Sequence, residues 1–273
     1  MKIAIFNKNF FNESHLNALR VLGDLIIYEN TYTEEKMIER LKGVEIAIAD
    51  CQIVPLNKKV LESTDALKFI AIKSIGYDLV DIATAKAKGI RVANVPGSST
   101  EAVAEHSIAL IIAVCKKIPA GDAMMRKAPF QIDQANQEHR KYLGFNLYGK
   151  TIGILGLGNI GLRVAQIGMG FGMKVFAFNR SKKNVAGVKQ VSLEKLLKES
   201  DIVSLHLPLT PETENLITAE RLQTMKPTAV LINTARGKIV DEKALYDTLQ
   251  SHKIAGAGLD VIVEWKKTIH YLN

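Results

Sequence analysis

The chain has 273 residues, of which 47% are hydrophobic and 23% charged, a balance typical of a globular protein with room for two modest domains. No apolar stretch is long enough to span a membrane and the N-terminus carries no signal-peptide pattern, so we expect a cytoplasmic protein without a membrane partner. The formal net charge is +8, but residues 1–97 hold 13 Lys and Arg against 12 Asp and Glu, whereas residues 98–273 hold 23 against 16. Because the excess lies in one half and no nucleic-acid-binding motif is present, it favours a small polyanionic ligand over nucleic acid.

Short apolar runs alternate with helical patterns along the whole chain. In the first half we predict strands at Ile3–Phe6, Leu25–Tyr28, Glu45–Ala49, Phe69–Ile72 and Arg91–Val95, and helices at Glu13–Leu22, Thr33–Leu41 and Asp81–Lys88. In the second half we predict strands at Thr151–Leu155, Lys174–Phe178, Ile202–Leu207, Ala229–Asn233 and Ala255–Asp260, and helices at Gly161–Gly170, Leu193–Glu199 and Glu242–His252. Strands at this spacing need crossover helices, so the sequence predicts an α/β protein with two open, parallel-sheet domains.

The boundary between the two domains is marked by a cluster of turn-forming residues. Asn94–Thr100 contains Pro, Gly, Ser and Thr, and a long helix is expected from Glu101 to Lys117, capped by Ser99 or Thr100. Residues 118–149 are irregular and polar, which predicts a long arm without regular structure. The first domain is therefore expected to cover residues 1–97.

Cysteine usage agrees with an intracellular protein. Cys51 and Cys115 stand far apart, and neither belongs to a metal-ligand spacing. We expect two reduced, buried thiols and no metal site.

A glycine motif opens the second half. Gly156, Gly158 and Gly161 follow the predicted strand Thr151–Leu155 and open a helix, with Asn159 and Ile160 between the last two glycines. In a dinucleotide-binding motif the three glycines permit a tight turn, the approach of a pyrophosphate and close packing of helix on strand. The free N–H groups at the helix N-terminus then favour the phosphates. The context predicts a Rossmann domain that binds a nicotinamide cofactor.

The loop after the next strand bears on the choice of cofactor. In NAD sites an acidic residue usually accepts hydrogen bonds from the ribose 2′-hydroxyl at this place, but here the strand ends at Asn179, followed by Arg180 and Ser181. An uncharged Asn179 does not repel a 2′-phosphate, and Arg180 pairs with one. The loop therefore favours NADP over NAD, the alternative being that Arg180 and Lys182 are only solvated surface charges.

Six blocks of sequence, spread over nearly the whole chain, carry a family resemblance. They are Ser74–Asp81, Asn94–Pro96 with Thr100 and Val103–Glu105, Gly153–Gly161, Ser204–Thr213, Asn233–Gly237 and Gly256–Val261. Together they resemble the D-isomer-specific 2-hydroxyacid dehydrogenases, and within them the glyoxylate/hydroxypyruvate reductase branch. The resemblance implies hydride transfer between NAD(P)H and a small 2-keto or 2-hydroxy acid. It also implies a flavodoxin-like substrate domain beside the Rossmann domain, and a homodimer formed through the long helix and the arm after it.

The resemblance also assigns roles to individual residues. It implies that Arg236 is the cation that holds the substrate carboxylate and carbonyl, and that the backbone of Ser74, Ile75 and Gly76 binds the carboxylate. The residues that it implies at the cofactor, besides those of the glycine motif and the Asn179 loop, are Thr100, His206, Pro208, Thr213, Thr234, Ala235 and Asp260. We expect no catalytic role for His206.

The C-terminal end departs from the family pattern. The family has a Glu about five residues after the Asp and a His further on; here the nearest Glu is Glu264, and His270 lies six residues later in a different context. We expect a C-terminally truncated member, with the nucleotide domain over residues 98–266, an aberrant tail over 267–273 and a substrate domain that lacks its last segment. Glu264 is the remaining candidate of the acid–base pair. The alternative to an active reductase is a non-catalytic NAD(P)-binding remnant or sensor.

Overall fold

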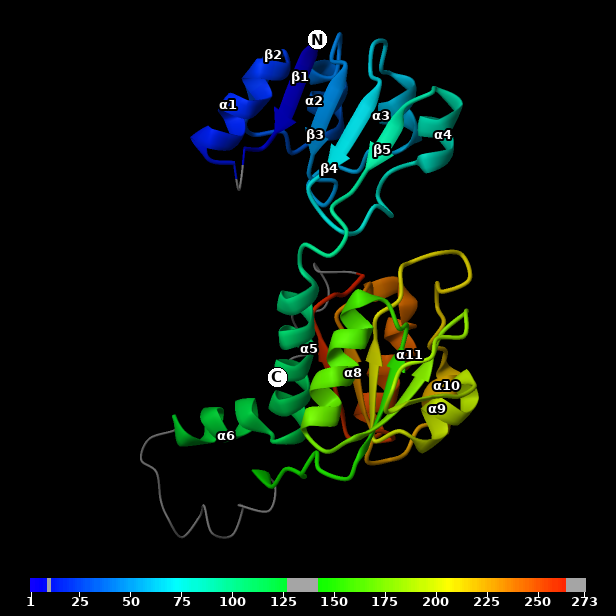
Figure 1. Cartoon of the computed structure of the whole chain (residues 1–273). Coiled ribbons are helices and arrows are strands. Elements are labelled where there is room, and N and C mark those ends of the chain that lie inside the picture. Colours follow the sequence, from blue (N-terminus) through cyan, green and yellow to red (C-terminus); the bar gives the residue numbers. More distant parts are fainter. Residues whose placement is uncertain (9–10, 127–141, 264–273) are drawn as a thin grey trace. The chain divides into compact units, whose positions relative to one another are not determined.

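The protein is described here by a computed structural model that places residues 1–8, 11–126 and 142–263. Its internal contacts divide the chain into two compact units, unit 1 from Met1 to Ser98 and unit 2 from Ser99 onward (Figure 1). Within those residue ranges, no helix is both long and apolar enough to cross a membrane.

Unit 1 is a parallel five-stranded sheet with helices between its strands. Its strands are β1 (Lys2–Phe6), β2 (Asp24–Tyr28), β3 (Ile46–Ala49), β4 (Phe69–Ile72) and β5 (Arg91–Ala93). Its helices are α1 (Glu13–Leu22), α2 (Glu34–Arg40), α3 (Lys58–Glu62) and α4 (Ile82–Ala87). The strand order β2-β1-β3-β4-β5 is that of flavodoxin-like doubly wound sheets, which confirms the predicted class.

Helices cover both faces of this sheet, and alternate residues of each strand serve the two faces. Ile3 and Ile5 of β1 pack with Leu16 of α1 on one face. Ala4 and Phe6 point to the other face, where α2, α3 and α4 build the larger core. This alternation follows from the two-residue period of a strand, and it explains why strands with two covered faces are continuous apolar runs.

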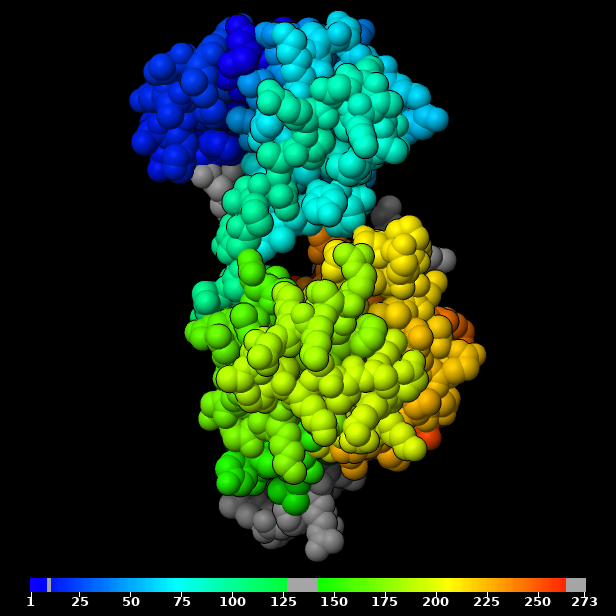
Figure 2. Space-filling view, turned by 45° about the vertical axis from the view of Figure 1, so that its right-hand side comes forward, coloured from blue at the N-terminus to red at the C-terminus, as the bar shows by residue number. Residues whose placement is uncertain are grey.

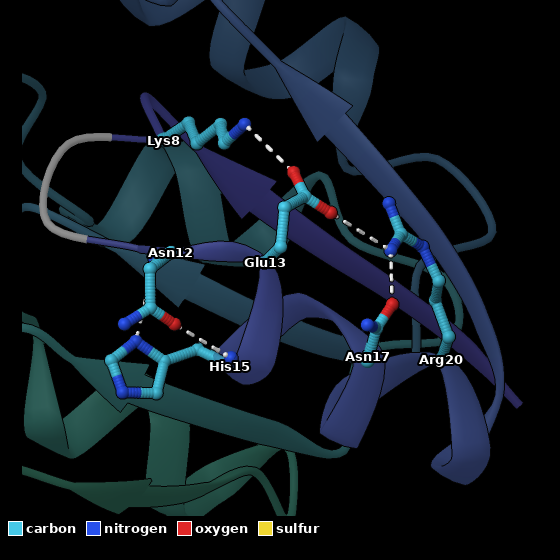
Figure 3. Close-up of polar contacts among 6 residues, drawn as sticks. All are labelled: Lys8, Asn12, Glu13, His15, Asn17 and Arg20. Carbon is cyan, nitrogen blue, oxygen red and sulfur yellow. Dashed lines mark hydrogen bonds and ion pairs between the residues drawn. The ribbon is translucent and has the colours of Figure 1, made fainter.

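Helix α1 begins where its first turn is capped by side chains (Figure 3). Asn12 Oδ1 accepts a hydrogen bond from the backbone N–H of His15 at 3.0 Å, and the imidazole of His15 accepts one from the N–H of Asn12 at 3.4 Å. Arg20 then donates to Asn17 at 2.6 Å and pairs with Glu13 at 3.3 Å. Because N-terminal N–H groups have no partner within the helix, this reciprocal cap stabilises the first turn. His15 therefore has a structural role.

Unit 2 contains a parallel six-stranded sheet. Its strands are β6 (Thr151–Leu155), β7 (Lys174–Phe178), β8 (Val188–Gln190), β9 (Ile202–Leu205), β10 (Val230–Asn233) and β11 (Gly256–Leu259). Its helical elements are α5 (Thr100–Cys115), α6 (Ile118–Met125), α8 (Asn159–Gly170), α9 (Leu193–Glu199), α10 (Ala219–Thr224), η2 (Gly237–Ile239) and α11 (Glu242–Gln250). The order β11-β10-β9-β6-β7-β8 is the Rossmann order, as predicted.

The two faces of this sheet have separate helix layers. Helices α5 and α8 lie side by side over one face (Figure 1), where Ile152 and Ile154 of β6 are buried against them. Helices α9, α10 and α11 contribute to the core on the other face, with Leu155 and Val203. Since β6 lies in the middle of the sheet, the loop that follows it is held between two complete layers.

The structure corrects the prediction for the arm. Residues 118–149 were expected to be irregular, yet they begin with α6, whose Pro119 lies in the first turn after Lys117 in a left-handed conformation (φ 53°). Proline suits the first turn of a helix because that turn's N–H groups lack partners in any case. Residues 127–141 lie outside the described residues. The short elements α3, β8 and α10 were not predicted, because three to six residues are too few to show a period.

Both cysteine thiols are buried in the core of their unit. Burial raises the pKa of Cys51 and of Cys115 to about 12, in the case of Cys51 with a further contribution from the charges of Asp50 and Asp78. A thiol with such a pKa is not a thiolate at neutral pH, so neither cysteine is a reactive nucleophile.

Candidate cofactor and substrate site

The glycine loop lies at the carboxyl end of β6, in the middle of the sheet of unit 2. Gly156 has φ +97°, a conformation that side-chain-bearing residues rarely adopt, and its N–H donates to the carbonyl of Phe178 at the end of β7. Gly158 is the N-cap of α8 and has no side chain to cap the helix. The first turn of α8 thus presents its N–H groups and its positive end without a capping side chain.

The fold requires two of the three glycines, and the third leaves open space. A Cβ on Gly156 would collide with the carbonyl of His206, and a Cβ on Gly161 would collide with the carbonyl of Gly156. By contrast, no described atom lies within 4 Å of the position that a Cβ on Gly158 would take. The fold itself therefore needs no glycine at position 158. An open cradle beside a helix N-terminus fits the pyrophosphate of a dinucleotide, for which a backbone without Cβ allows close approach.

The loop after β7 is attached to the glycine loop at Leu157. Asn179 Oδ1 accepts a hydrogen bond from the N–H of Leu157 at 3.1 Å, and Asn179 Nδ2 donates to the carbonyl of Ser181 at 2.9 Å. Lys183 Nζ donates to the carbonyl of Leu157 at 2.6 Å. Residues 180–184 are exposed, in the yellow-green surface of unit 2 in Figure 2. Asn179 thus contacts the glycine motif directly and Ser181 contacts it through Asn179, while Arg180 lies between them in the exposed loop.

The charge of Arg180 interacts with the carboxylate of Glu212. The pKa of Glu212 lies below its usual range because of hydrogen bonds to the side chain of Thr210 and to its own backbone, and the positive charge of Arg180 contributes. Glu212 belongs to the turn that joins two of the predicted cofactor residues, since the hydroxyl of Thr213 donates to the carbonyl of Pro208 at 2.7 Å. The charge of Arg180 is the smallest of these contributions, so the interaction between the two exposed side chains is weak.

His206 follows β9 and lies beside the glycine loop. Its Nε2 lies 2.9 Å from the hydroxyl of buried Ser204, and burial lowers the pKa of His206 to about 4. An imidazole with this pKa is neutral at pH 7 and is no general acid there. The backbone carbonyl of His206 lies so close to Gly156 that a Cβ there would collide with it.

The depressed pKa of His206 predicts a pH dependence of stability. A histidine that binds its proton at pH 6.5 when unfolded and only near pH 4 when folded makes the free energy of unfolding fall as the pH drops through that window. We expect a loss of about 1–3 kcal/mol between pH 7 and pH 4.5 in urea unfolding, which His206→Gln reduces. The exposed His252→Asn serves as the control. An identical pH profile for His206→Gln and the unaltered protein would refute the assignment.

The turn after β10 is braced by a residue of the strand itself. Asn233, fully buried, donates from Nδ2 to the carbonyl of Arg236 at 2.9 Å and accepts from the N–H of Ala235 at 3.0 Å. The Arg236 guanidinium donates to the carbonyl of Ala235 at 2.7 Å. Gly237 allows Ile262 to pass closely, because a Cβ there would touch its backbone. Arg236 is thereby held at the carboxyl edge of the sheet, where open α/β sheets bind ligands.

Helix α5 is joined to the same edge by two polar contacts. The hydroxyl of Ser107 lies 2.8 Å from that of Thr234, and both residues are buried. His106 Nε2 lies 3.3 Å from a carboxylate oxygen of Asp260, with both side chains about half exposed. Thr234 and Asp260, predicted at the cofactor, therefore lie beside α5, whose first residue is the predicted Thr100.

In unit 1, the predicted substrate loop follows β4 directly. Asn94 Nδ2 donates to the carbonyl of Ile75 at 2.7 Å, and the N–H of Val95 donates to the carbonyl of Ser74 at 3.2 Å. The hydroxyl of Ser74 donates to the carbonyl of Gly76 at 2.9 Å. All three carbonyls are thus engaged, whereas none of the three N–H groups donates to another described residue. Such a loop can offer its N–H groups to an anion.

Some predicted groups cannot be placed. Glu264 and His270 lie outside the described residues. Within the part of the chain that the structure describes, no three His, Cys, Asp or Glu side chains gather so that they could hold a metal ion.

Three residues of the site were missed from the sequence. Asn233 and Ser107 brace Thr234, Ala235 and Arg236, and Lys183 binds the glycine loop. Asn233 begins the quoted block Asn233–Gly237, and a buried polar residue that ends a strand is a usable signal for a turn brace. Nothing local indicated Ser107, and the basic cluster of residues 180–183 did not indicate that Lys183 binds Leu157, since these partners lie far away in the sequence.

Comparisons with known proteins agree with this geometry. The family model described as "D-isomer specific 2-hydroxyacid dehydrogenase, NAD binding domain" matches residues 108–269. The chain is 42% identical over 270 residues to the glyoxylate reductase of Thermococcus litoralis, covering 97% of this chain and 81% of that protein.

Two solved structures are similar over both units. An acyclic imino acid reductase, Bsp5, in complex with NADPH and D-Arg has a TM-score of 0.90 at 38% identity, with 98% of this chain and 85% of that chain covered. The D-lactate dehydrogenase of Aquifex aeolicus, complexed with NAD and lactic acid, has a TM-score of 0.86 at 34% identity, with 99% and 79% covered. This chain spans about four fifths of the length of these proteins. Strand order, glycine loop and these matches together show that the chain belongs to the D-isomer-specific 2-hydroxyacid dehydrogenases, a family of NAD(P)-dependent enzymes.

Proposed function

We propose that this chain transfers a hydride between NAD(P)H and a small 2-keto acid of the glyoxylate and hydroxypyruvate class, with NADPH preferred. The observation that carries the proposal is found within unit 2. A glycine loop open at Gly158 and the guanidinium of Arg236 follow β6 and β10 of one sheet at its carboxyl edge. A dinucleotide cradle and a carboxylate-binding cation at one ligand-binding edge are what reduction of a 2-keto acid needs.

The proposal gives the predicted substrate-binding and catalytic residues the following roles. Bound NAD(P)H supplies the hydride from C4 of its nicotinamide. Arg236 binds the substrate carboxylate and carbonyl, and the N–H groups of Ser74, Ile75 and Gly76 bind the carboxylate. Glu264 is the remaining candidate of the acid–base pair, which supplies the proton that the substrate carbonyl oxygen takes up when the hydride is added to its carbon.

The remaining predicted residues hold the cofactor in the proposal. Asp260 and Thr100 contact its nicotinamide half, while His206, Pro208 and Thr213 form the rim of the adenosine pocket. Thr234 and Ala235 line the path between them. Asn159 and Ile160 offer backbone N–H groups to the pyrophosphate.

The proposal is tested by following NADPH absorbance with glyoxylate or hydroxypyruvate as substrate. We expect glyoxylate-dependent oxidation of NADPH, faster than oxidation of NADH at equal concentration. NADPH binding without turnover of either acid would instead support the non-catalytic cofactor-binding protein. Tighter binding of NADH than of NADPH would contradict the proposed cofactor preference while leaving the reaction class intact.

The homodimer stays a prediction. None of the described side chains of α6 is buried, and Ile118 and Met125 at its ends are 52% and 59% exposed. Exposed apolar side chains on an arm are compatible with burial against a second copy.

A further inference from the structure

We propose that Lys183 is a specificity-determining residue of the cofactor site, which binds the 2′-phosphate of NADPH from its position on the glycine loop. This inference rests on the proposed function, because it concerns the cofactor of the same site. It gives a role to Lys183, which the sequence places in the basic cluster of residues 180–183 without a role of its own.

The position of the Lys183 ammonium supports the inference. Its Nζ donates to the carbonyl of Leu157 at 2.6 Å, while Asn179 Oδ1 accepts from the N–H of the same residue at 3.1 Å. Asn179 occupies the place at the end of the second strand where dinucleotide sites contact the ribose 2′-hydroxyl. Lys183 and the residue at the 2′ position therefore bind the same residue of the glycine loop.

Hydrogen bonds within the loop keep Lys183 close to Leu157. The backbone N–H of Lys183 donates to Gln190 Oε1 at 2.8 Å, and Gln190 Nε2 donates to the carbonyl of Ser181 at 3.2 Å. Gln190 is the last residue of β8, which pairs with β7. Gln190 of this strand thus binds the loop at Ser181 and at Lys183, and the exposed Lys183 side chain turns toward Leu157.

The charge of Lys183 remains available to an anion. An ammonium has three N–H donors, and its bond to the Leu157 carbonyl engages one acceptor that carries no net charge. Arg180 belongs to the same exposed loop. Of the two cations, Lys183 is the one whose side chain is hydrogen-bonded to the glycine loop.

The competing explanation is that Lys183 only braces the glycine loop. A brace would affect NADPH and NADH equally, since both cofactors share the pyrophosphate that the loop contacts. A 2′-phosphate contact affects NADPH alone. The ratio of the two dissociation constants therefore distinguishes the explanations.

The experiment is a fluorescence titration of the full chain with NADPH and NADH, in the unaltered protein and in Lys183→Met. We expect Lys183→Met to weaken NADPH binding about tenfold or more and NADH binding by less than about threefold, since a charge-assisted hydrogen bond is lost only with NADPH. Lys183→Arg is expected to keep most of the preference. Lys198→Met removes an exposed cation of α9 outside this loop and is the control, with both constants nearly unchanged.

Each outcome bears on one claim. Equal weakening of both cofactors by Lys183→Met, or no change in either, overturns the inference. If the unaltered protein binds NADH as tightly as NADPH, the proposed preference fails. A selective loss of NADPH binding in Lys183→Met would still support the role of this lysine, because a contact can exist without producing a net preference. Competition by 2′,5′-ADP against ADP repeats the comparison without the nicotinamide, with the same loss expected only for 2′,5′-ADP.

Discussion

Replacing Arg236 by Gln is expected to lower kcat/KM for glyoxylate about 10²–10³-fold and to leave the dissociation constant of NADPH within about twofold. The reason is that the guanidinium offers paired donors to the substrate carboxylate and to the charge that develops on its carbonyl oxygen, whereas an amide carries no charge. The turn itself is held mainly by Asn233, so the change leaves the backbone in place. Steady-state kinetics with NADPH and glyoxylate measures the effect.

Two further variants make this result interpretable. Arg236→Lys keeps the charge but not the planar fork, and we expect it to recover only part of the activity. Lys238→Gln removes a neighbouring cation, which is paired with Glu214 at 3.6 Å, and we expect near-normal kcat/KM. Normal kinetics of Arg236→Gln would mean that this arginine only closes the turn through its bond to the carbonyl of Ala235.

Gly158→Ala is expected to weaken cofactor binding strongly while it changes the free energy of unfolding little. Because no described atom lies within 4 Å of the new Cβ, Gly158→Ala costs the fold at most about 1 kcal/mol, the usual difference between glycine and alanine at an N-cap. The same methyl group would occupy the space that a pyrophosphate needs, so we expect NADPH and NADH to bind at least tenfold more weakly. Urea unfolding and fluorescence titration give the two quantities.

Gly161→Ala is the matched comparison. Its Cβ would overlap the carbonyl oxygen of Gly156, which is backbone and cannot move without disturbing the loop. We expect a loss of about 1–3 kcal/mol of unfolding free energy, as for overpacking of a core, together with the loss of cofactor binding. If Gly158→Ala bound NADPH normally, the loop would not be the pyrophosphate cradle.

Most of the fold could be predicted from the sequence because parallel strands covered on both faces are continuous apolar runs. Thr151–Leu155 and Lys174–Phe178 were predicted with the bounds that the structure shows. Most other predicted ends differ by one or two residues, as for the strand Arg91–Ala93, which was predicted to end at Val95. Helix α6 was missed because it contains no polar face: all the residues of Ile118–Met125 except Asp122 are apolar, glycine or proline.

The sequence by itself determined the class and the cofactor loop of this protein, because apolar periodicity and the spacing of three glycines are local properties of the chain, whereas the order of the strands appeared only in the structure. Which side chains surround the loop was decided only by the tertiary structure. Lys183 reaches Leu157, Ser107 reaches Thr234 and His106 reaches Asp260, across 26, 127 and 154 positions of sequence. Such pairs have no spacing to recognise, since crossover connections and helix packing alone bring them together. The glycine motif therefore indicated where a dinucleotide would bind, and the fold indicated which cation stands beside it.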